Sequence, residues 1–162
     1  MRYLFEDWGR IESNLRARKI FLFLDFDGTL APIAPRPQDA FLAKEIKEIL
    51  FTLANTKKIR LAIISGRGLE DIKRVVGIGN IIYVGNHGLE IEGQGINFTS
   101  NVPITTKASL QKIKLVLQQK LNQIEGVIIE DKGLSLSIHY RLVNSGQVEE
   151  VKKRLDEAMV LC

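Results

Sequence analysis

The fold is decided by one short stretch, which reads Phe21-Leu22-Phe23-Leu24-Asp25-Phe26-Asp27-Gly28-Thr29-Leu30. A run of large apolar residues that ends in Asp and Gly predicts a strand buried on both faces, as in a parallel sheet. Asp25 and Asp27 then emerge at the carboxyl end of the strand, where open α/β sheets bind their ligands. A carboxylate at this place needs a cation or hydrogen-bond donors to hold it. The alternative is an ordinary strand followed by an Asp-Gly turn.

Two more apolar strands follow, and each ends in a polar or glycine-rich turn. Residues 59–64 lead into Ser65-Gly66-Arg67-Gly68 and a short helix over 69–76, and residues 81–85 lead into Asn86-His87-Gly88. Strands joined by helices predict right-handed crossovers and a parallel sheet whose carboxyl ends share one edge. A serine hydroxyl, backbone amides and a helix N-terminus together form a natural anion site.

The pattern changes near Phe98. We expect a hairpin over 89–98, a helix from about 105 to 124, two antiparallel strands over 127–132 and 134–141, and a last helix over 148–159. The second of these strands alternates apolar and polar residues, which predicts one core face and one polar face. The chain therefore reads as an α/β protein with a parallel core over 1–98 and a smaller α/β lid over 99–162.

Composition excludes several classes of function. The 162 residues are 45% hydrophobic and 26% charged with a net charge of +4, and Lys alternates with Glu along the helices, which indicates a solvated surface rather than a nucleic-acid interface. No apolar run approaches the roughly 20 residues that span a membrane. The only cysteine is Cys162, so no internal disulfide forms, which fits a cytoplasmic location.

The hexapeptide Asp25-Phe26-Asp27-Gly28-Thr29-Leu30 resembles the first motif of the haloacid-dehalogenase-like phosphohydrolases. The resemblance implies that Asp25 is the nucleophile, that Asp27 is the general acid and base, and that both bind Mg²⁺, Asp27 through its backbone carbonyl. The chemistry is sound by itself, because a carboxylate that forms an acyl phosphate divides a difficult hydrolysis into two easier steps. Attack of an anion on a phosphate also requires a counter-charge, which Mg²⁺ supplies.

Five motifs in order are similar to the trehalose-6-phosphate phosphatase family. They are Asp25 to Ile33, Ser65-Gly66-Arg67, Gly85 to Glu90, Glu130-Asp131-Lys132 and His139-Tyr140-Arg141. This resemblance implies an incomplete Rossmann-type core of the haloacid-dehalogenase-like class with an α/β cap. It also implies Mg²⁺-dependent hydrolysis of trehalose 6-phosphate to trehalose and phosphate, with a sugar phosphate as the partner.

The same resemblance implies phosphate-binding and sugar-binding roles for further residues. Thr29, Ser65, Gly66 and Arg67 are expected to bind the phosphate, and His87, Glu130, Lys132 and Arg141 the sugar. Each group has an ordinary alternative. Arg67 can equally pair with a local acid, His87 can be a turn residue satisfied by backbone, and the lid residues can be surface charges. His139 is a weaker candidate for the sugar.

The chain departs from the family pattern at its end. The family's third motif, a lysine, and its fourth, an acidic cluster, do not occur before Cys162. Without later strands the first strand is an edge, and an apolar edge strand favours association. We therefore expect either that the native chain continues or that copies associate through this strand. A phosphatase for another sugar phosphate, of the sucrose or mannosylglycerate phosphate type, a catalytically dead sugar-phosphate-binding module and a domain of a fused synthase-phosphatase are the alternatives.

Overall fold

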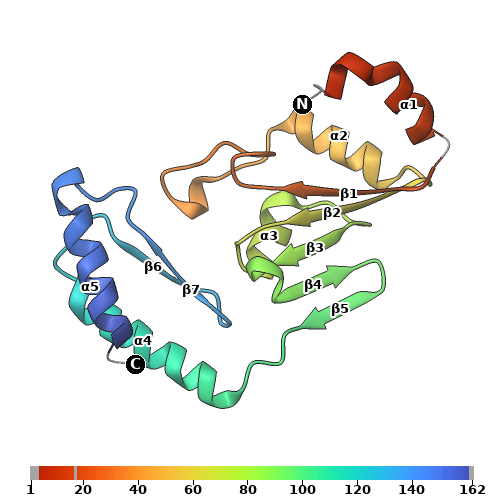
Figure 1. Ribbon diagram of the computed structural model, residues 1–162. Coiled ribbons are helices and arrows are strands. Elements are labelled where there is room, and N and C mark those ends of the chain that lie inside the picture. The colour runs from red at the N-terminus through yellow and green to blue at the C-terminus, as the bar shows by residue number, and fades with distance from the viewer. Residues whose placement is uncertain (1–3, 17, 161–162) are drawn as a thin grey trace. The chain divides into compact units, whose positions relative to one another are not determined.

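A computed structural model describes residues 4–16 and 18–160, which divide into two compact units (Figure 1). The first contains the described residues up to Ile33 together with Ala40–Phe98. The second contains Ala34–Asp39 and the described residues from Thr99 onward. Cys162 lies outside the described residues. Among the residues that are described, no helix combines the length and apolar character that crossing a membrane requires.

The first unit is an α/β layer built on one sheet. Its elements are η1 (Leu4–Asp7), α1 (Trp8–Arg16), β1 (Ile20–Asp25), α2 (Lys44–Ala54), β2 (Ile59–Ile64), α3 (Leu69–Val76), β3 (Ile82–Gly85), η3 (Asn86–Gly88), β4 (Glu90–Gly93) and β5 (Ile96–Thr99). The sheet has five strands in the order β1-β2-β3-β4-β5. Strands β1, β2 and β3 are parallel, and β4 is antiparallel to β3. The predicted parallel core is therefore confirmed for its first three strands.

Strand register aligns the carboxyl ends of the parallel strands. Asp25 at the end of β1 is opposite Ile64 at the end of β2, and Ile64 is opposite Val84 in β3. The residues that follow each strand therefore emerge side by side. Apolar side chains of β2 and α3 fill the core beneath them, among them Leu61, Ile63 and Ile72, each fully buried.

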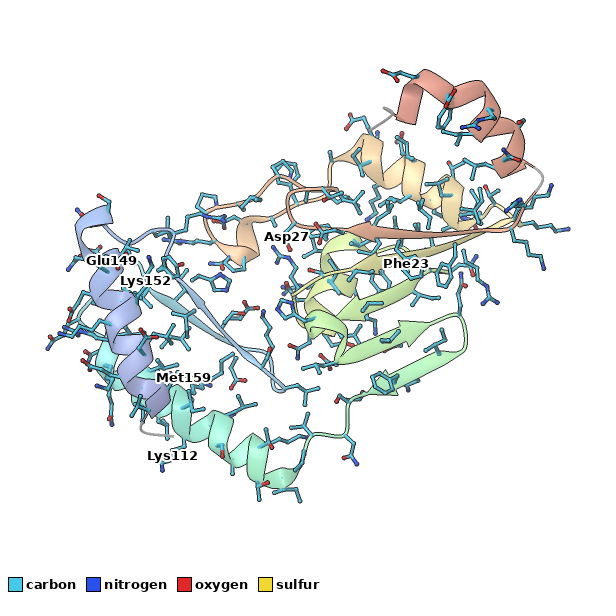
Figure 2. The ribbon with its side chains drawn as sticks, viewed as in Figure 1. Phe23, Asp27, Lys112, Glu149, Lys152 and Met159 are labelled. Carbon is cyan, nitrogen blue, oxygen red and sulfur yellow. The ribbon has the colours of Figure 1, made fainter. Side chains whose placement is uncertain are left out.

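Strand β1 is an edge strand, as the sequence predicts, but it is not buried on both faces. Phe21 is 48% exposed and Phe23 is 55% exposed, and their rings stack with centroids 4.2 Å apart. Figure 2 labels Phe23 on β1. The prediction of two buried faces is wrong here because it assumed a central strand, whereas no described strand lies beyond β1. Association of two copies through this strand stays a prediction.

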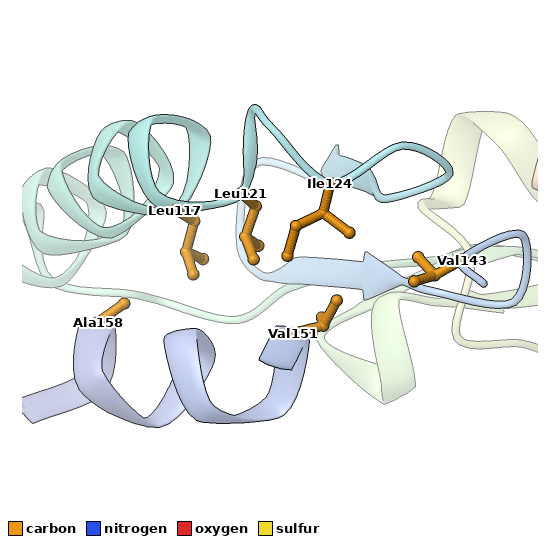
Figure 3. Close-up of a cluster of buried hydrophobic side chains, with 6 residues drawn as sticks. All are labelled: Leu117, Leu121, Ile124, Val143, Val151 and Ala158. Carbon is orange, nitrogen blue, oxygen red and sulfur yellow. The ribbon is translucent and has the colours of Figure 1, made fainter. Parts of the chain in front are cut away.

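The second unit has its own core. It contains η2 (Pro37–Asp39), α4 (Ile104–Leu121), β6 (Ile128–Asp131), β7 (Leu136–His139), η4 (Ser145–Gln147) and α5 (Val148–Val160). Helices α4 and α5 pack against each other, and their buried side chains meet those of the neighbouring segments in one cluster (Figure 3). The cluster consists of Leu117, Leu121, Ile124, Val143, Val151 and Ala158. Ile129 and Ile138, opposite each other in the β6–β7 pair, pack against it.

Asp131 links β6 to α4 through hydrogen bonds that also lower its pKa. A hydrogen bond from Lys114, then those from the Gly133 amide and Gln111, lower the pKa of Asp131 from 3.8 to about 2. A carboxyl whose pKa is depressed in the folded state stabilises the fold above its unfolded pKa and stops doing so as the pH falls through its folded pKa.

We expect Asp131→Asn to lower the free energy of unfolding at neutral pH, because it removes the ion pair with Lys114. The loss should be only about 1 kcal/mol, since solvent screens ion pairs at the surface. The difference from wild type should disappear as the pH falls from 3.8 to about 2. Urea unfolding over this range measures it, with Asp156→Asn, at an exposed residue of α5, as the matched control. A difference that stays constant with pH would contradict the assignment.

Candidate functional site

The loop after β1 is folded around a buried ring. Phe26 is fully buried, and its carbonyl accepts hydrogen bonds from the amides of Thr29, Leu30 and Ala31 at 3.0 to 3.3 Å. Gly28 adopts φ +87°, a left-handed conformation that glycine reaches without strain. Because Phe26 points into the core, the carboxylates on either side of it, Asp25 and Asp27, stay accessible to solvent.

Asp27 is held by Arg67, which follows β2. The Arg67 Nη2 donates to Asp27 Oδ1 at 2.8 Å, and Nε donates to Oδ2 at 3.0 Å and to Oδ1 at 3.3 Å. This is the two-pronged geometry that a guanidinium makes with a carboxylate. The Ser65 hydroxyl also donates to Asp27 Oδ2 at 3.3 Å, so the loops after β1 and β2 are joined at this carboxylate (Figure 2 labels Asp27).

Arg67 is itself fixed from several sides. It is 7% exposed, its Nη1 donates to Asp71 of α3 at 2.8 Å, and its guanidinium lies 5.5 Å from the centre of the Phe26 ring. Burial acts against the charge, but the hydrogen bonds to Asp27 and Asp71 outweigh it and raise the pKa of Arg67 above its ordinary value. Arg67 is therefore a buried cation between two carboxylates.

Asp25 has a different environment. Its Oδ2 accepts a hydrogen bond from the Thr29 hydroxyl at 3.0 Å. Within residues 4–16 and 18–160, no Lys, Arg or His forms an ion pair with Asp25. Two acids separated by one residue thus differ in kind, because Asp27 is paired with a cation whereas Asp25 is open to a ligand.

The turn after β3 completes this edge of the sheet. Asn86 and His87 both have positive φ, 51° and 58°, which is a strained conformation for residues other than glycine. The turn is held in place because the Asn86 amide donates to the Arg67 carbonyl at 2.6 Å and the His87 amide to the Ser65 carbonyl at 3.3 Å. The His87 ring lies against Gly66, where an added Cβ would be 2.5 Å from its Cε1. An alanine at position 66 would therefore force the exposed His87 ring to move.

The polar residues of β6 and β7 form a separate group in the second unit. His139 Nε2 is 2.7 Å from Glu130 Oε2, and Lys132 Nζ donates to Ser137 Oγ at 2.6 Å and lies 3.9 Å from the same Glu130 oxygen. The strand predicted over 134–141, with Arg141 on its polar face, is shorter than expected: β7 ends at His139, and Arg141 lies in the following turn. Its Nη1 donates to the Ala34 carbonyl at 2.7 Å.

The sequence-predicted residues thus fall into two sets. Loops after β1, β2 and β3 in the first unit carry Asp25, Asp27, Thr29, Ser65, Gly66, Arg67 and His87, and the second unit carries Glu130, Lys132 and Arg141. Sequence analysis left open a local acid as the partner of Arg67 without naming one, and the structure identifies it as Asp71, in the first turn of the helix that follows the Arg67 loop.

The described part of the chain has no ready-made cluster of side chains for a metal ion. It contains no group of three or more His, Cys, Asp or Glu side chains that could hold a metal ion. Mg²⁺, however, is commonly bound through one or two carboxylates together with water and substrate phosphate. The open carboxylate of Asp25 fits that pattern.

Comparisons with known proteins agree on one family. A family model described as trehalose-phosphatase matches residues 23–160. Trehalose-phosphate phosphatase B of Arabidopsis thaliana is 32% identical over 143 residues, which cover 83% of this chain and 38% of that protein. Trehalose-phosphate phosphatase of Mycobacterium tuberculosis is 34% identical over 142 residues, which cover 87% of this chain and 36% of that protein. This chain therefore spans well under half the length of these relatives.

A solved structure has the same fold. The C-terminal domain of the C. albicans trehalose-6-phosphate phosphatase superposes with a TM-score of 0.76 at 25% identity, over 94% of this chain and 55% of that chain. A second structure, of a trehalose-6-phosphate phosphatase related protein, gives a TM-score of 0.70 at 21% identity. The likeness extends over both described units.

The contact between Gly66 and His87 predicts the effect of a methyl group. We expect Gly66→Ala to displace the exposed His87 ring, because the new Cβ occupies its place. The cost should be roughly 1 kcal/mol or less, at the low end for an inserted methyl group, since an exposed ring can rotate away. The NMR shifts of the His87 ring and thermal unfolding measure the two effects. Gly79→Ala, which has no atom within 4 Å of its added Cβ, is the control, and an unmoved His87 in Gly66→Ala would contradict the packing.

Proposed function

Because the chain belongs to the trehalose-phosphatase family, we propose that the loops after β1, β2 and β3 take part in the hydrolysis of trehalose 6-phosphate to trehalose and inorganic phosphate. The family and fold class that the motifs indicated are thereby confirmed. The observation that carries the proposal is the contrast between an open Asp25 and an Asp27 held by Arg67 and Ser65. Such a pair suits a nucleophile beside an acid and base.

In the first proposed step, a carboxylate oxygen of Asp25 bonds to phosphorus. The bond between phosphorus and the sugar oxygen breaks with its electron pair on oxygen, and that oxygen takes a proton from Asp27, which enters this step in the carboxyl form because it keeps the proton taken from water in the preceding turnover. The products are trehalose, the Asp27 carboxylate and a phosphorylated Asp25. Proton transfer to the leaving group matters here because an alkoxide is a poor leaving group.

In the second proposed step, Asp27 acts as the base. Its carboxylate takes a proton from water while the water oxygen bonds to phosphorus and the bond from phosphorus to Asp25 breaks. Asp25 returns as a carboxylate, Asp27 returns protonated, and inorganic phosphate is released. One carboxyl serves both steps because the proton it gives in the first is recovered in the second.

Phosphate binding is proposed for the small groups at the same edge. The Ser65 hydroxyl donates to Asp27 and can turn to a phosphoryl oxygen when substrate binds. The Thr29 hydroxyl, in the loop after β1, and the Gly66 amide, in the loop after β2, are proposed as further donors to the phosphate. Such hydrogen bonds help catalysis when they tighten on the transferring group. The Nε, Nη1 and Nη2 atoms of Arg67 all donate to carboxylates, so we do not assign Arg67 to the phosphate.

Mg²⁺ is the proposed cofactor. The Asp25 carboxylate and the Asp27 carbonyl would hold it, and when bound it would offset the negative charge of nucleophile and phosphate. Glu130, Lys132 and Arg141 are proposed to bind sugar hydroxyls, since they combine an acceptor with donors. His87 is proposed to border the sugar pocket. A cytoplasmic location stays a prediction from the sequence.

The proposal is tested by phosphate release from trehalose 6-phosphate with Mg²⁺. We expect Asp25→Asn to lower the rate by on the order of 10⁴-fold or more, because it removes the nucleophile. Asp156→Asn on α5 is the matched control and should keep the wild-type rate. Retention of activity in Asp25→Asn would contradict the assignment. Binding of trehalose 6-phosphate by calorimetry without any turnover by wild type would favour a binding module.

A further inference from the structure

We propose that Arg67 is a positioning residue for Asp27, itself fixed by Asp71, and that it acts on the departure of the sugar rather than on the phosphate. The proposal rests on the proposed function, because it needs Asp27 to give a proton to the leaving oxygen. It concerns three side chains from three parts of the first unit, namely the loop after β1, the loop after β2 and helix α3.

The division of the guanidinium between two acids supports this role. The edge formed by Nε and Nη2 meets both oxygens of Asp27, whereas Nη1 meets Asp71. A planar guanidinium that is hydrogen-bonded on two sides is fixed in one orientation. Its two parallel hydrogen bonds then fix the orientation of the Asp27 carboxylate as well. A lysine at the same place would keep the charge and lose the fork.

Burial distinguishes Arg67 from an ordinary surface partner. Its side chain is 8% exposed whereas that of Asp27 is 38% exposed, so the pair has a buried end and an open end. The open end is the carboxylate that must reach substrate. A buried cation without its partner is strongly unfavourable, which keeps the fork directed at Asp27.

The backbone around Arg67 is fixed as well. Its amide donates to Ser65 Oγ at 3.1 Å, and its carbonyl accepts from the Asn86 amide at 2.6 Å. The Phe26 ring, which anchors the Asp25 and Asp27 loop, lies against the guanidinium. Asp71 completes the support and is held in turn by exposed Arg74. Each end of the Asp27 contact therefore belongs to a rigid part of the fold.

The chemical consequence is specific to the leaving group. Transfer of a proton by a positioned acid contributes about 10²- to 10⁴-fold when the leaving group is a poor one. A sugar alkoxide needs this proton, whereas p-nitrophenolate leaves without it. The value of kcat/KM reports the steps up to the breaking of the bond to phosphorus, so comparison of the two substrates isolates the acid function from the later attack of water.

The first experiment compares trehalose 6-phosphate with p-nitrophenyl phosphate. We expect Arg67→Lys to lower kcat/KM for the sugar phosphate at least about tenfold more than for the aryl phosphate, since only the former uses the Asp27 proton. Arg60→Lys, the same change at an exposed residue of β2, should leave both unchanged. An equal loss with both substrates would overturn the proposal, because a phosphate ligand or a general loss of fold acts on both.

The support from Asp71 is tested in the same way. Asp71→Asn should show the same selective loss to a smaller degree, because Arg67 keeps its contacts with Asp27. Glu70→Gln, on the same helix and 83% exposed at its side chain, is the matched control. Asp71→Asn also serves if Arg67→Lys fails to fold, which thermal unfolding detects, and an unselective loss in Asp71→Asn then overturns the proposal.

A second measurement does not depend on activity. Three-bond NMR couplings report the χ1 rotamer of Asp27, and we expect one rotamer in the wild-type chain and averaged couplings in Arg67→Lys. Asp27 couplings unchanged by that substitution would overturn the positioning role. If wild type hydrolyses neither substrate, the proposed function fails for this chain, and the couplings alone decide whether Arg67 positions Asp27.

Discussion

The ion pair between Arg67 and Asp27 is the interaction on which the rest of this site depends. Two carboxylates at the end of one strand repel each other. Arg67 neutralises the charge of Asp27 through an ion pair, and it does not pair with Asp25. The buried guanidinium is satisfied only when Asp27 and Asp71 both face it. Two chemically identical side chains are thereby given different properties, one open to a ligand and one held in a fixed direction.

The pairing is possible because of the parallel register of the sheet. Asp25 is aligned with Ile64, so the loop that begins at Ser65 emerges beside the loop that contains Asp27. The turn after β3 is joined to the loop after β2 by hydrogen bonds from the backbone amides of Asn86 and His87. Both residues adopt a positive φ to make these bonds, which is a strained conformation. The sheet thus supplies the alignment, and hydrogen bonds between loops supply the precision that proton transfer needs.

Sequence reasoning succeeded where periodicity is strong and local. The predicted helix over 69–76 and the predicted strand over 59–64 have the same first and last residues as α3 and β2. Their apolar spacing and the glycine-containing turns beside them mark where each element begins and ends. It failed where the outcome depends on neighbours distant in sequence. The exposure of Phe21 and Phe23 depends on which strands flank β1, and the pairing of Arg67 with Asp27 depends on the register of β1 and β2. The end of β7 before Arg141 is a different failure, because it depends on a local turn that alternation of apolar and polar residues does not reveal. The acidic motif itself was readable because its spacing places both carboxylates at one strand end.

The division between Asp25 and Asp27 is tested most directly by locating the phosphoryl group. A single turnover with trehalose 6-phosphate labelled at phosphorus, stopped in acid and followed by peptide mapping, identifies the residue that carries the label. The open carboxylate of Asp25 and the paired carboxylate of Asp27 predict label on Asp25 alone. Label on Asp27, or phosphate release with no labelled peptide at any time, would contradict the assignment.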